Sequence, residues 1–143
     1  MNNSYNLDRF IKAQDRVYQQ VITELSNGRK TGHWMWYIFP QLEKLGRSPT
    51  ALFYGIKNLE EAQAYLEHPV LGARLIECCQ ILLNLEEKSV DRIFGFPDNK
   101  KLKSSMTLFN AVPNRSPVFE QVLTKFFDSE QDDKTLSLIN MNG

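Results

Sequence analysis

Apolar residues recur at three- and four-residue intervals over much of the chain, which is the period of an amphipathic helix. The clearest case is residues 8–26, which end in the helix-terminating pair Asn27-Gly28. A second long helix is predicted from Pro69 to about Glu87. Its broad apolar face consists of Leu71, Leu75, Cys78, Cys79, Leu82 and Leu83.

Capping residues predict shorter helices between and after these two. Ser48, Asn58, Ser89 and Ser116 each stand where a side-chain oxygen can accept the first free backbone N–H groups of a helix. Further elements are predicted as a short turn over 40–45, a helix beginning near 98 and a last helix over 133–141. The serines and threonine of 104–107 could equally mark a fresh helix start.

No pair of alternating strands with a tight hairpin turn is convincing, so the sequence predicts an all-α fold of about six or seven helices. At 143 residues the chain fits one domain, 1–143, with its core over about 7–141. One short segment could depart from helical geometry, the run from His33 to Gln41. It contains both tryptophans. It also contains Pro40, which disfavours helical geometry at the preceding residue, Phe39.

The composition argues against nucleic-acid binding, membrane insertion and a cysteine-based metal or redox site. Seventeen basic and seventeen acidic side chains cancel, so no overall field attracts nucleic acid or an anionic membrane. No apolar run approaches the roughly 18 residues of a membrane span, and residues 1–4 lack the form of a signal peptide. We therefore expect a cytoplasmic protein. The adjacent Cys78 and Cys79 do not have the spacing of a zinc or redox site and are expected to be free thiols.

Four stretches together carry a family resemblance. They are His33–Gln41, Tyr65–Leu75, Lys101–Phe109 and Asp132–Leu136. On these blocks, from about Arg9 to Leu138, the chain resembles the bacterial family called domain of unknown function 1810, in the Rv-1873-like helical fold group. The resemblance implies a multihelical single domain and brings no established activity. Members have been labelled calpastatin, but such an inhibitor is a disordered chain, whereas this one is 42% hydrophobic.

A fainter similarity of arrangement concerns Met106-Thr107-Leu108-Phe109. A Met-x-x-Phe element near the end of a helical domain is similar to one in a family that hydrolyses N-glycosidic bonds of ADP-ribose and riboflavin precursors. Four residues of this composition occur widely, so the likeness is an analogy of arrangement.

Two groups of residues are candidates for ligand binding. The aromatic run offers flat faces that can stack on a ring, with polar groups at its ends; its candidates are His33, Trp34, Trp36, Tyr37 and Gln41. The alternative for both tryptophans is that they fill the core. Near position 100, ammonium and hydroxyl groups suit a phosphate or carboxylate, and the candidates are Lys101, Lys103, Ser104 and Ser105. These could equally form a solvated helix face.

Catalytic residues are harder to select. His33 is the first candidate for proton transfer because it joins the aromatic run to Arg29 and Lys30. Glu77 is the second, since a carboxylate among apolar neighbours can act as an acid or base, although it could instead face water or pair with Arg74. No ligand set for a metal and no glycine-rich phosphate loop occur, so we expect neither a metal nor a cofactor.

Two functional hypotheses from different classes follow. In the first, the protein binds a small anionic ring-bearing ligand, such as a nucleotide or an ADP-ribose-like molecule, with N-glycoside hydrolysis as an added activity. In the second, it is a non-enzymatic module that binds another protein or a second copy of itself. Aromatic side chains lining a concave pocket beside the lysines would favour the ligand, and a flat exposed apolar patch would favour a partner.

Overall fold

The computed structural model describes residues 5–142, with side chains for residues 5–140. Within that range the chain forms nine α-helices and one 3-10 helix, and its only extended pairing is an isolated parallel bridge between Leu42 and Ile56. The elements are α1 (Asp8–Ser26), α2 (Met35–Ile38), η1 (Glu43–Leu45), α3 (Pro49–Tyr54), α4 (Leu59–Glu67), α5 (Leu71–Asn84), α6 (Val90–Phe94), α7 (Asp98–Asn110), α8 (Val118–Phe127) and α9 (Asp133–Asn142). The all-α prediction is confirmed. Residues 1–4 and 143 of the predicted domain lie outside the described residues.

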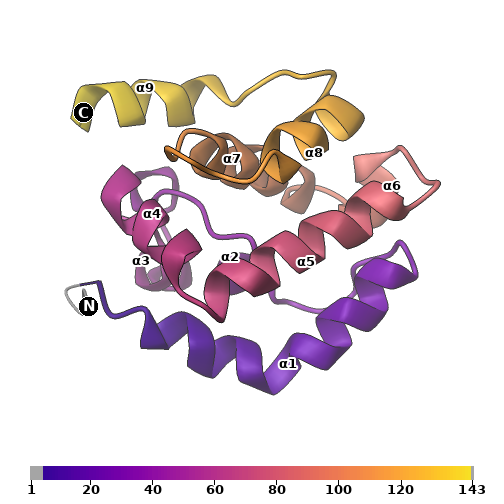
Figure 1. The fold of residues 1–143 in the computed structure, drawn as a ribbon. Helices are drawn as coiled ribbons and strands as arrows, with labels where there is room; N and C mark the ends of the chain where they lie inside the picture. Colours follow the sequence, from indigo (N-terminus) through magenta and orange to yellow (C-terminus); the bar gives the residue numbers. More distant parts are fainter. Residues whose placement is uncertain (1–4, 143) are drawn as a thin grey trace.

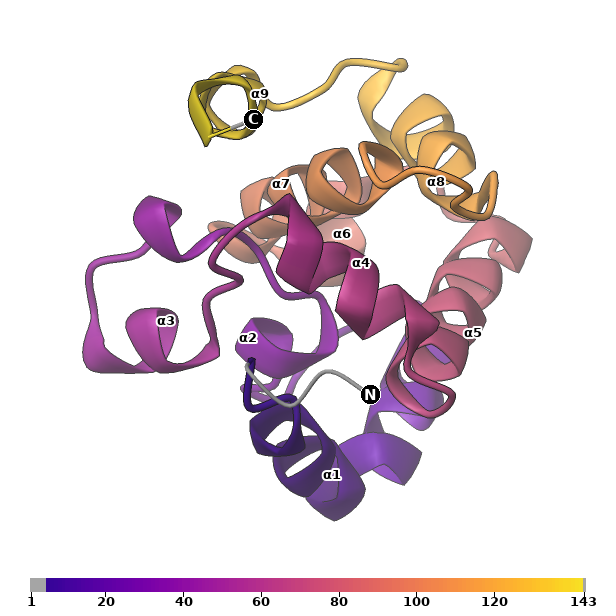
Figure 2. The same ribbon diagram turned by 60° about the vertical axis from the view of Figure 1, so that its left-hand side comes forward.

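The helices surround one apolar core. In both ribbon views α1 and α9 lie on opposite sides of the molecule, with α5, α7 and α8 between them (Figures 1 and 2). α5 packs against α1, α4 and α8, while α7 packs against α8 and α9. The largest fully buried side chains are Trp34, Tyr65, Phe10, Phe39, Phe109, Phe119, Leu25, Ile56, Leu71, Leu75, Leu82 and Ile93.

Four of the helix starts follow from the predicted capping chemistry. At the start of α8 the Ser116 hydroxyl accepts the backbone N–H of Val118 at 3.2 Å. The side chains of Ser48, Asn58 and Ser89 accept the backbone N–H of the third residue of α3, α4 and α6 respectively. α7 begins at Asp98 without a side-chain cap and runs unbroken to Asn110. The alternative helix start at 104–107 is therefore wrong, because those residues continue a helix that has already formed.

α5 begins two residues later than Pro69, the predicted start, and His68 lies at the junction between α4 and α5. This residue ends α4, and its ring Nδ1 accepts the N–H groups of Val70 and Leu71 at 3.1 and 3.3 Å. At the other end of α5, the Lys125 ammonium donates a hydrogen bond to the carbonyl oxygen of Leu82 at 2.8 Å. Both ends of the central helix are thus closed by side chains from outside it.

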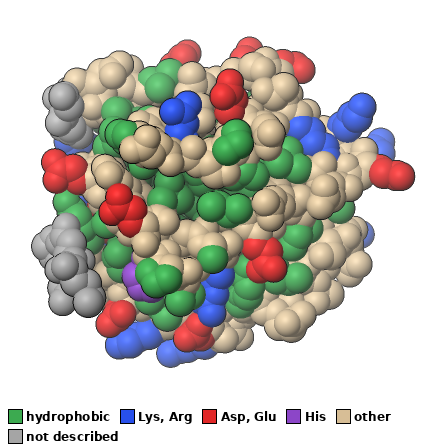
Figure 3. Space-filling model, in the orientation of Figure 1, with side chains coloured by type: hydrophobic (Ala, Val, Ile, Leu, Met, Phe, Trp, Pro, Cys, Tyr) green, Lys and Arg blue, Asp and Glu red, His purple; other side chains and the backbone are tan. Residues whose placement is uncertain are grey.

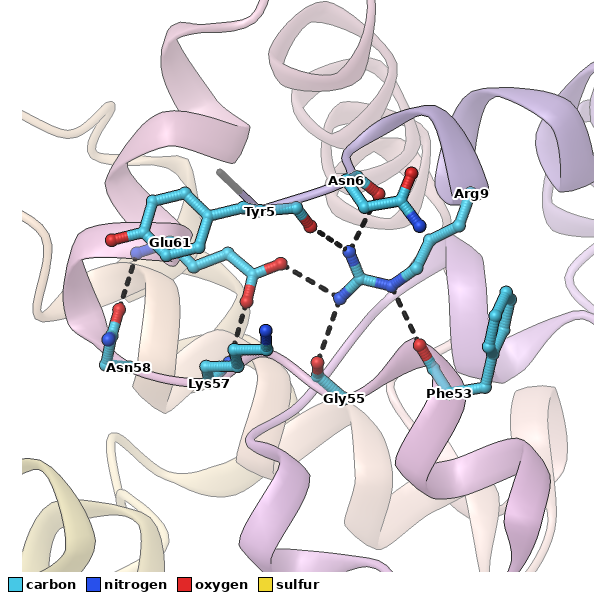
Figure 4. Close-up of polar contacts among 8 residues, drawn as sticks. All are labelled: Tyr5, Asn6, Arg9, Phe53, Gly55, Lys57, Asn58 and Glu61. Atoms are coloured by element: carbon cyan, nitrogen blue, oxygen red, sulfur yellow. Dashed lines mark hydrogen bonds and ion pairs between the residues drawn. The ribbon is translucent and has the colours of Figure 1, made fainter. Parts of the chain in front are cut away.

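A buried ion pair joins the start of α1 to the start of α4 (Figure 4). The Nη2 atom of Arg9 lies 2.9 Å from Oε2 of Glu61, whose side chain is 0% exposed. The same guanidinium donates to the carbonyl oxygens of Tyr5, Asn6, Phe53 and Gly55, and so every side of it meets an acceptor.

The segment that Arg9 holds is packed closely against η1. A Cβ atom built on Gly55 would lie 2.4 Å from the Cα of Glu43, so only glycine allows the end of α3 to approach η1 this closely. On the other side of Gly55, Glu61 Oε1 accepts the backbone N–H of Lys57 at 2.8 Å. Arg9 and Glu61 therefore fix the position of α3 and η1.

We expect Leu75→Ala and Leu82→Ala to lower the free energy of unfolding by about 2 to 5 kcal/mol each, because both side chains are buried on α5 and alanine would leave a cavity. Urea melts would measure the loss. Gln80→Ala, at an exposed position of the same helix, serves as the control and should change stability by about 0.5 kcal/mol or less. Losses below about 1 kcal/mol at both leucines would contradict the packing of α5.

Glu61→Ala should cost about 3 to 5 kcal/mol of stability, because it leaves the buried charge of Arg9 without its partner. The exposed neighbour Glu60 provides the matched control, since Glu60→Ala removes the same charge from the same helix turn without affecting Arg9. Equal melting temperatures for the two variants would show that the ion pair does not stabilise the fold.

Candidate functional site

A depression of about 380 Å³ lies where α2, η1, α3, α7 and the start of α9 come together. Its lining is formed by Trp36, Gln41, Leu45, Gly46, Arg47, Ser48, Ala51, Pro97, Lys100, Lys101, Ser104, Asp132 and Lys134. Four of these side chains are cationic and one is anionic. We call this feature the cationic depression.

An ammonium group lies directly over an aromatic ring in this depression. Nζ of Lys101 is 3.7 Å from the ring centroid of Trp36, which is within the range of a cation–π contact. Oδ1 of Asp98 holds the same ammonium from the other side at 3.4 Å, and Oδ2 of Asp98 lies 2.7 Å from Nζ of Lys30. Asp98 therefore positions Lys101 against Trp36.

The other three cations of the depression carry uncompensated charge. Arg47, Lys100 and Lys134 are exposed, and none lies within 4.0 Å of a carboxylate in the described part of the chain. In a protein with no net charge, three such cations around one hollow create a local positive potential. Such a potential would favour an anion over a cation at this surface.

The depression brings together four of the nine ligand-binding residues predicted from sequence, namely Trp36, Gln41, Lys101 and Ser104. Ser104 is 8% exposed, and its hydroxyl makes no hydrogen bond to the described residues. It is therefore a polar residue in the lining of the hollow that a ligand can bond.

Trp34 belongs to the core. It is 1% exposed, and its indole N–H donates to Oε1 of Glu24 at 3.0 Å. The same carboxylate accepts the N–H groups of Thr31 and Gly32 at 2.7 and 2.9 Å, and its other oxygen accepts from Gln20. Trp34 therefore fills the core, as the alternative interpretation of the sequence held, and Glu24 supplies the partner that a buried indole N–H needs.

These bonds shift the titration of Glu24. Burial by itself raises the pKa of this carboxyl, but the N–H groups of Gly32 and Thr31, followed by Gln20 and Trp34, lower the pKa to about 2. The group is therefore ionised at neutral pH and acts as an acceptor that closes the turn after α1.

The remaining sequence candidates lie outside the depression. His33 is exposed, and Tyr37 packs its ring 5.1 Å from that of Tyr54. Lys103 pairs with Glu130 at 3.3 Å, and Ser105 is fully buried with a hydroxyl that has no partner in the described residues. None of the four lines the hollow that contains Trp36 and Lys101.

Glu77 also lies away from the depression. It is exposed on α5 and accepts a hydrogen bond from the hydroxyl of Tyr18. Burial, together with Cys78 and Glu77, raises the pKa of Tyr18. Cys78 and Cys79 are free and buried, and burial raises the pKa of Cys78 to about 12, so this thiol stays protonated at neutral pH.

Sequence reasoning missed three charged residues of the depression: Arg47, Asp132 and Lys134. Asp132 and Lys134 are distant in sequence from the aromatic run, and Arg47 follows it in the connection to α3, so no local pattern connects them to Trp36. Lys100 belongs to the cluster of lysines and hydroxyl groups that the sequence shows near position 100, and the position of α7 places it in the lining of the hollow.

Within residues 5–142 no three His, Cys, Asp or Glu side chains are grouped so that they could hold a metal ion. The same residues include no helix whose length and apolar character would let it cross a membrane.

Comparison with known proteins places this fold. A family model described as "Protein of unknown function (DUF1810)" matches residues 4–139. The chain belongs to the DUF1810 family. The crystal structure of Rv1873, a conserved hypothetical protein from Mycobacterium tuberculosis, is 47% identical and superposes with a TM-score of 0.94, covering 96% of this chain and 99% of that one. No curated protein matches the chain.

We predict that Glu24 makes stability depend on pH in the acid range. Its folded pKa of about 2 is below the ordinary value of 4.5, so the stabilisation is complete above about pH 4.5 and is lost as the pH falls toward 2. Glu24→Gln should lower stability at pH 7 by about 1 to 3 kcal/mol, because an amide accepts fewer of the four bonds. Melts of both proteins from pH 7 to 2.5 would measure this. A constant difference between them over that range would contradict the assignment.

Proposed function

We propose that the protein binds a small anionic ligand that carries a ring, of the nucleotide or ADP-ribose-like class, in the cationic depression. The observation that carries the proposal is the Lys101 ammonium 3.7 Å from the centre of the Trp36 ring, inside a hollow that three unpaired cations surround. One hollow therefore holds an indole ring beside positive charge for a phosphate, and the ring of the ligand would stack on the part of Trp36 that Lys101 leaves uncovered.

The neighbouring polar groups support the same proposal. Gln41 and Ser104 line the hollow with side chains that make no hydrogen bond to the described residues, so a ligand can bond them without breaking existing contacts. The depression is also open to solvent on the side of the exposed Arg47 and Lys134. A pocket with one aromatic surface and a few convergent polar groups is typical of small-molecule sites.

The proposal is for binding, without N-glycoside hydrolysis. Met106 and Phe109, which carry the analogy to the hydrolase family, are both 0% exposed and belong to the core. The two catalytic candidates, His33 and Glu77, are not among the residues that line the hollow. The two candidates that the sequence offered for catalysis are therefore not placed beside the proposed ligand.

Binding can be tested by titrating the full chain with ADP, ADP-ribose and inorganic phosphate in a calorimeter. We expect ADP and ADP-ribose to bind more tightly than phosphate, because only they can also contact Trp36. Lys101→Gln should weaken ADP binding about tenfold or more, the typical effect of losing a charge-assisted hydrogen bond. The fold should remain intact, because a partly exposed ion pair such as Lys101 to Asp98 contributes little to stability.

The matched control is Lys103→Gln, which removes the same charge from the same helix two residues away, where Lys103 pairs with Glu130 outside the hollow. This variant should bind ADP as the wild type does. Equal weakening in both variants would indicate non-specific attraction. The absence of binding by all three ligands at millimolar concentration would rule out the proposed function.

The alternative of a protein-interaction module has its own surface. Hydrophobic side chains gather over the middle of the face that shows α4 and α5, and most charged groups lie around its edge (Figure 3). A hollow of about 190 Å³ on α4, α5 and the connection to α8 includes Leu66, Ile76, Val112 and Phe119 in its lining. This is the surface to examine for a partner protein if the ligand titrations fail.

A further inference from the structure

One acidic side chain lines the cationic depression and needs an explanation. Asp132 lies just before α9, and its Oδ2 atom accepts the backbone N–H of Thr135 at 3.0 Å and the hydroxyl of the same residue at 2.5 Å. Its own backbone N–H donates to Oγ1 of Thr107 on α7 at 2.9 Å. Both threonines are 0% exposed, so the carboxylate is held in a fixed position.

The capping bonds use only one of the two carboxylate oxygens. Oδ1 of Asp132 makes no hydrogen bond to residues 5–142, and neither oxygen lies within 4.0 Å of any of the four cations that line the hollow. Asp132 therefore does not neutralise the lysines beside it. It leaves a free acceptor at the edge of a cationic hollow.

For a simple anion this acid is unfavourable, since it repels the charge that the lysines attract. For a ligand that also carries hydroxyl groups it is favourable, because a carboxylate is a strong acceptor for O–H donors. The ribose of a nucleotide provides such donors a short distance from its phosphates, and acidic side chains bind ribose hydroxyls in dinucleotide-binding folds. Cations and one fixed acid in the same hollow fit a ligand of this mixed kind.

We propose that Oδ1 of Asp132 accepts hydrogen bonds from the ribose hydroxyls of the ligand, so that the cationic depression selects ribonucleotides over deoxy analogues and over simple anions. This inference rests on the proposed function and specifies the ligand class of the same site. The phosphates are attracted by the four cations of the depression, and the ribose hydroxyls are recognised by Asp132.

The test compares ADP with dideoxy-ADP, which lacks both ribose hydroxyls, on the full-length wild type and on Asp132→Asn, by calorimetry. On the wild type, ADP should bind about tenfold or more tightly than dideoxy-ADP. On Asp132→Asn the two ligands should bind within about twofold of each other. Dideoxy-ADP should bind this variant at least as tightly as the wild type, because the repelling charge is gone.

Two features of the experiment distinguish a loss of ribose recognition from a loss of folding. Asparagine is itself a good N-cap and can still accept the N–H of Thr135, so the variant should keep its melting temperature within a few degrees. Asp133→Asn removes the same charge one residue further on, at an exposed position outside the lining, and should leave the preference for ADP unchanged. The wild-type comparison of ligands also stands without any variant.

The outcomes distinguish this inference from the proposed function. If wild-type protein binds ADP and dideoxy-ADP equally, Asp132 does not read the sugar, and the anion site remains. If Asp132→Asn weakens both ligands by the same factor, the acid only supports the structure and the inference is overturned. If neither ADP nor dideoxy-ADP binds the wild type, the proposed function is overturned together with this inference.

Discussion

The buried guanidinium of Arg9 is the constraint on which one half of the molecule depends. A charge in the interior persists only when its N–H groups are all bonded and its charge is paired, and Arg9 meets both conditions by drawing together three separate parts of the chain. The carbonyls that it uses, from Phe53 and Gly55, belong to the end of α3. The cationic depression takes one of its walls from the start of that same helix, at Ser48 and Ala51. The ion pair thus positions part of the candidate site without touching it.

Glu24 has the corresponding role for the aromatic run. By accepting the N–H groups of Thr31, Gly32 and the Trp34 indole, it fixes how the chain leaves α1 and enters α2. α2 is a single helical turn. Trp36, two residues after the buried Trp34, lies on the side of this turn that faces away from the core. The density of aromatic residues therefore has two causes, since Trp34 fills the interior and Trp36 borders the hollow. The sequence alone could not separate them, because a run this short has no resolvable period.

The same contrast explains how much the sequence could predict. Helix bounds such as those of α1 were predictable because they depend on apolar period and on residues a few positions away that end the helix. Arg9, Glu24 and Glu61 look like ordinary charges on solvated helix faces, since their partners are fixed only by the tertiary fold. At the site, Lys101 and Trp36 were predictable by residue type. Arg47, Asp132 and Lys134 were not, because Arg47 comes from the connection before α3 and the other two from the start of α9, which only the tertiary fold brings together.

The distribution of charge distinguishes the cationic depression from the rest of the protein. The chain has as many acids as bases, so each buried cation can find a partner, and Arg9 and Lys30 both do. Around the depression three of the four cations have no acidic partner, although two acids are close by. Asp98 binds Lys30 and Lys101, and Asp132 caps α9. Arg47, Lys100 and Lys134 repel one another there without compensation, which a fold selected for stability alone would not favour. An anionic ligand would remove that repulsion, and so the local excess of positive charge in a neutral protein is the feature on which the proposed binding rests.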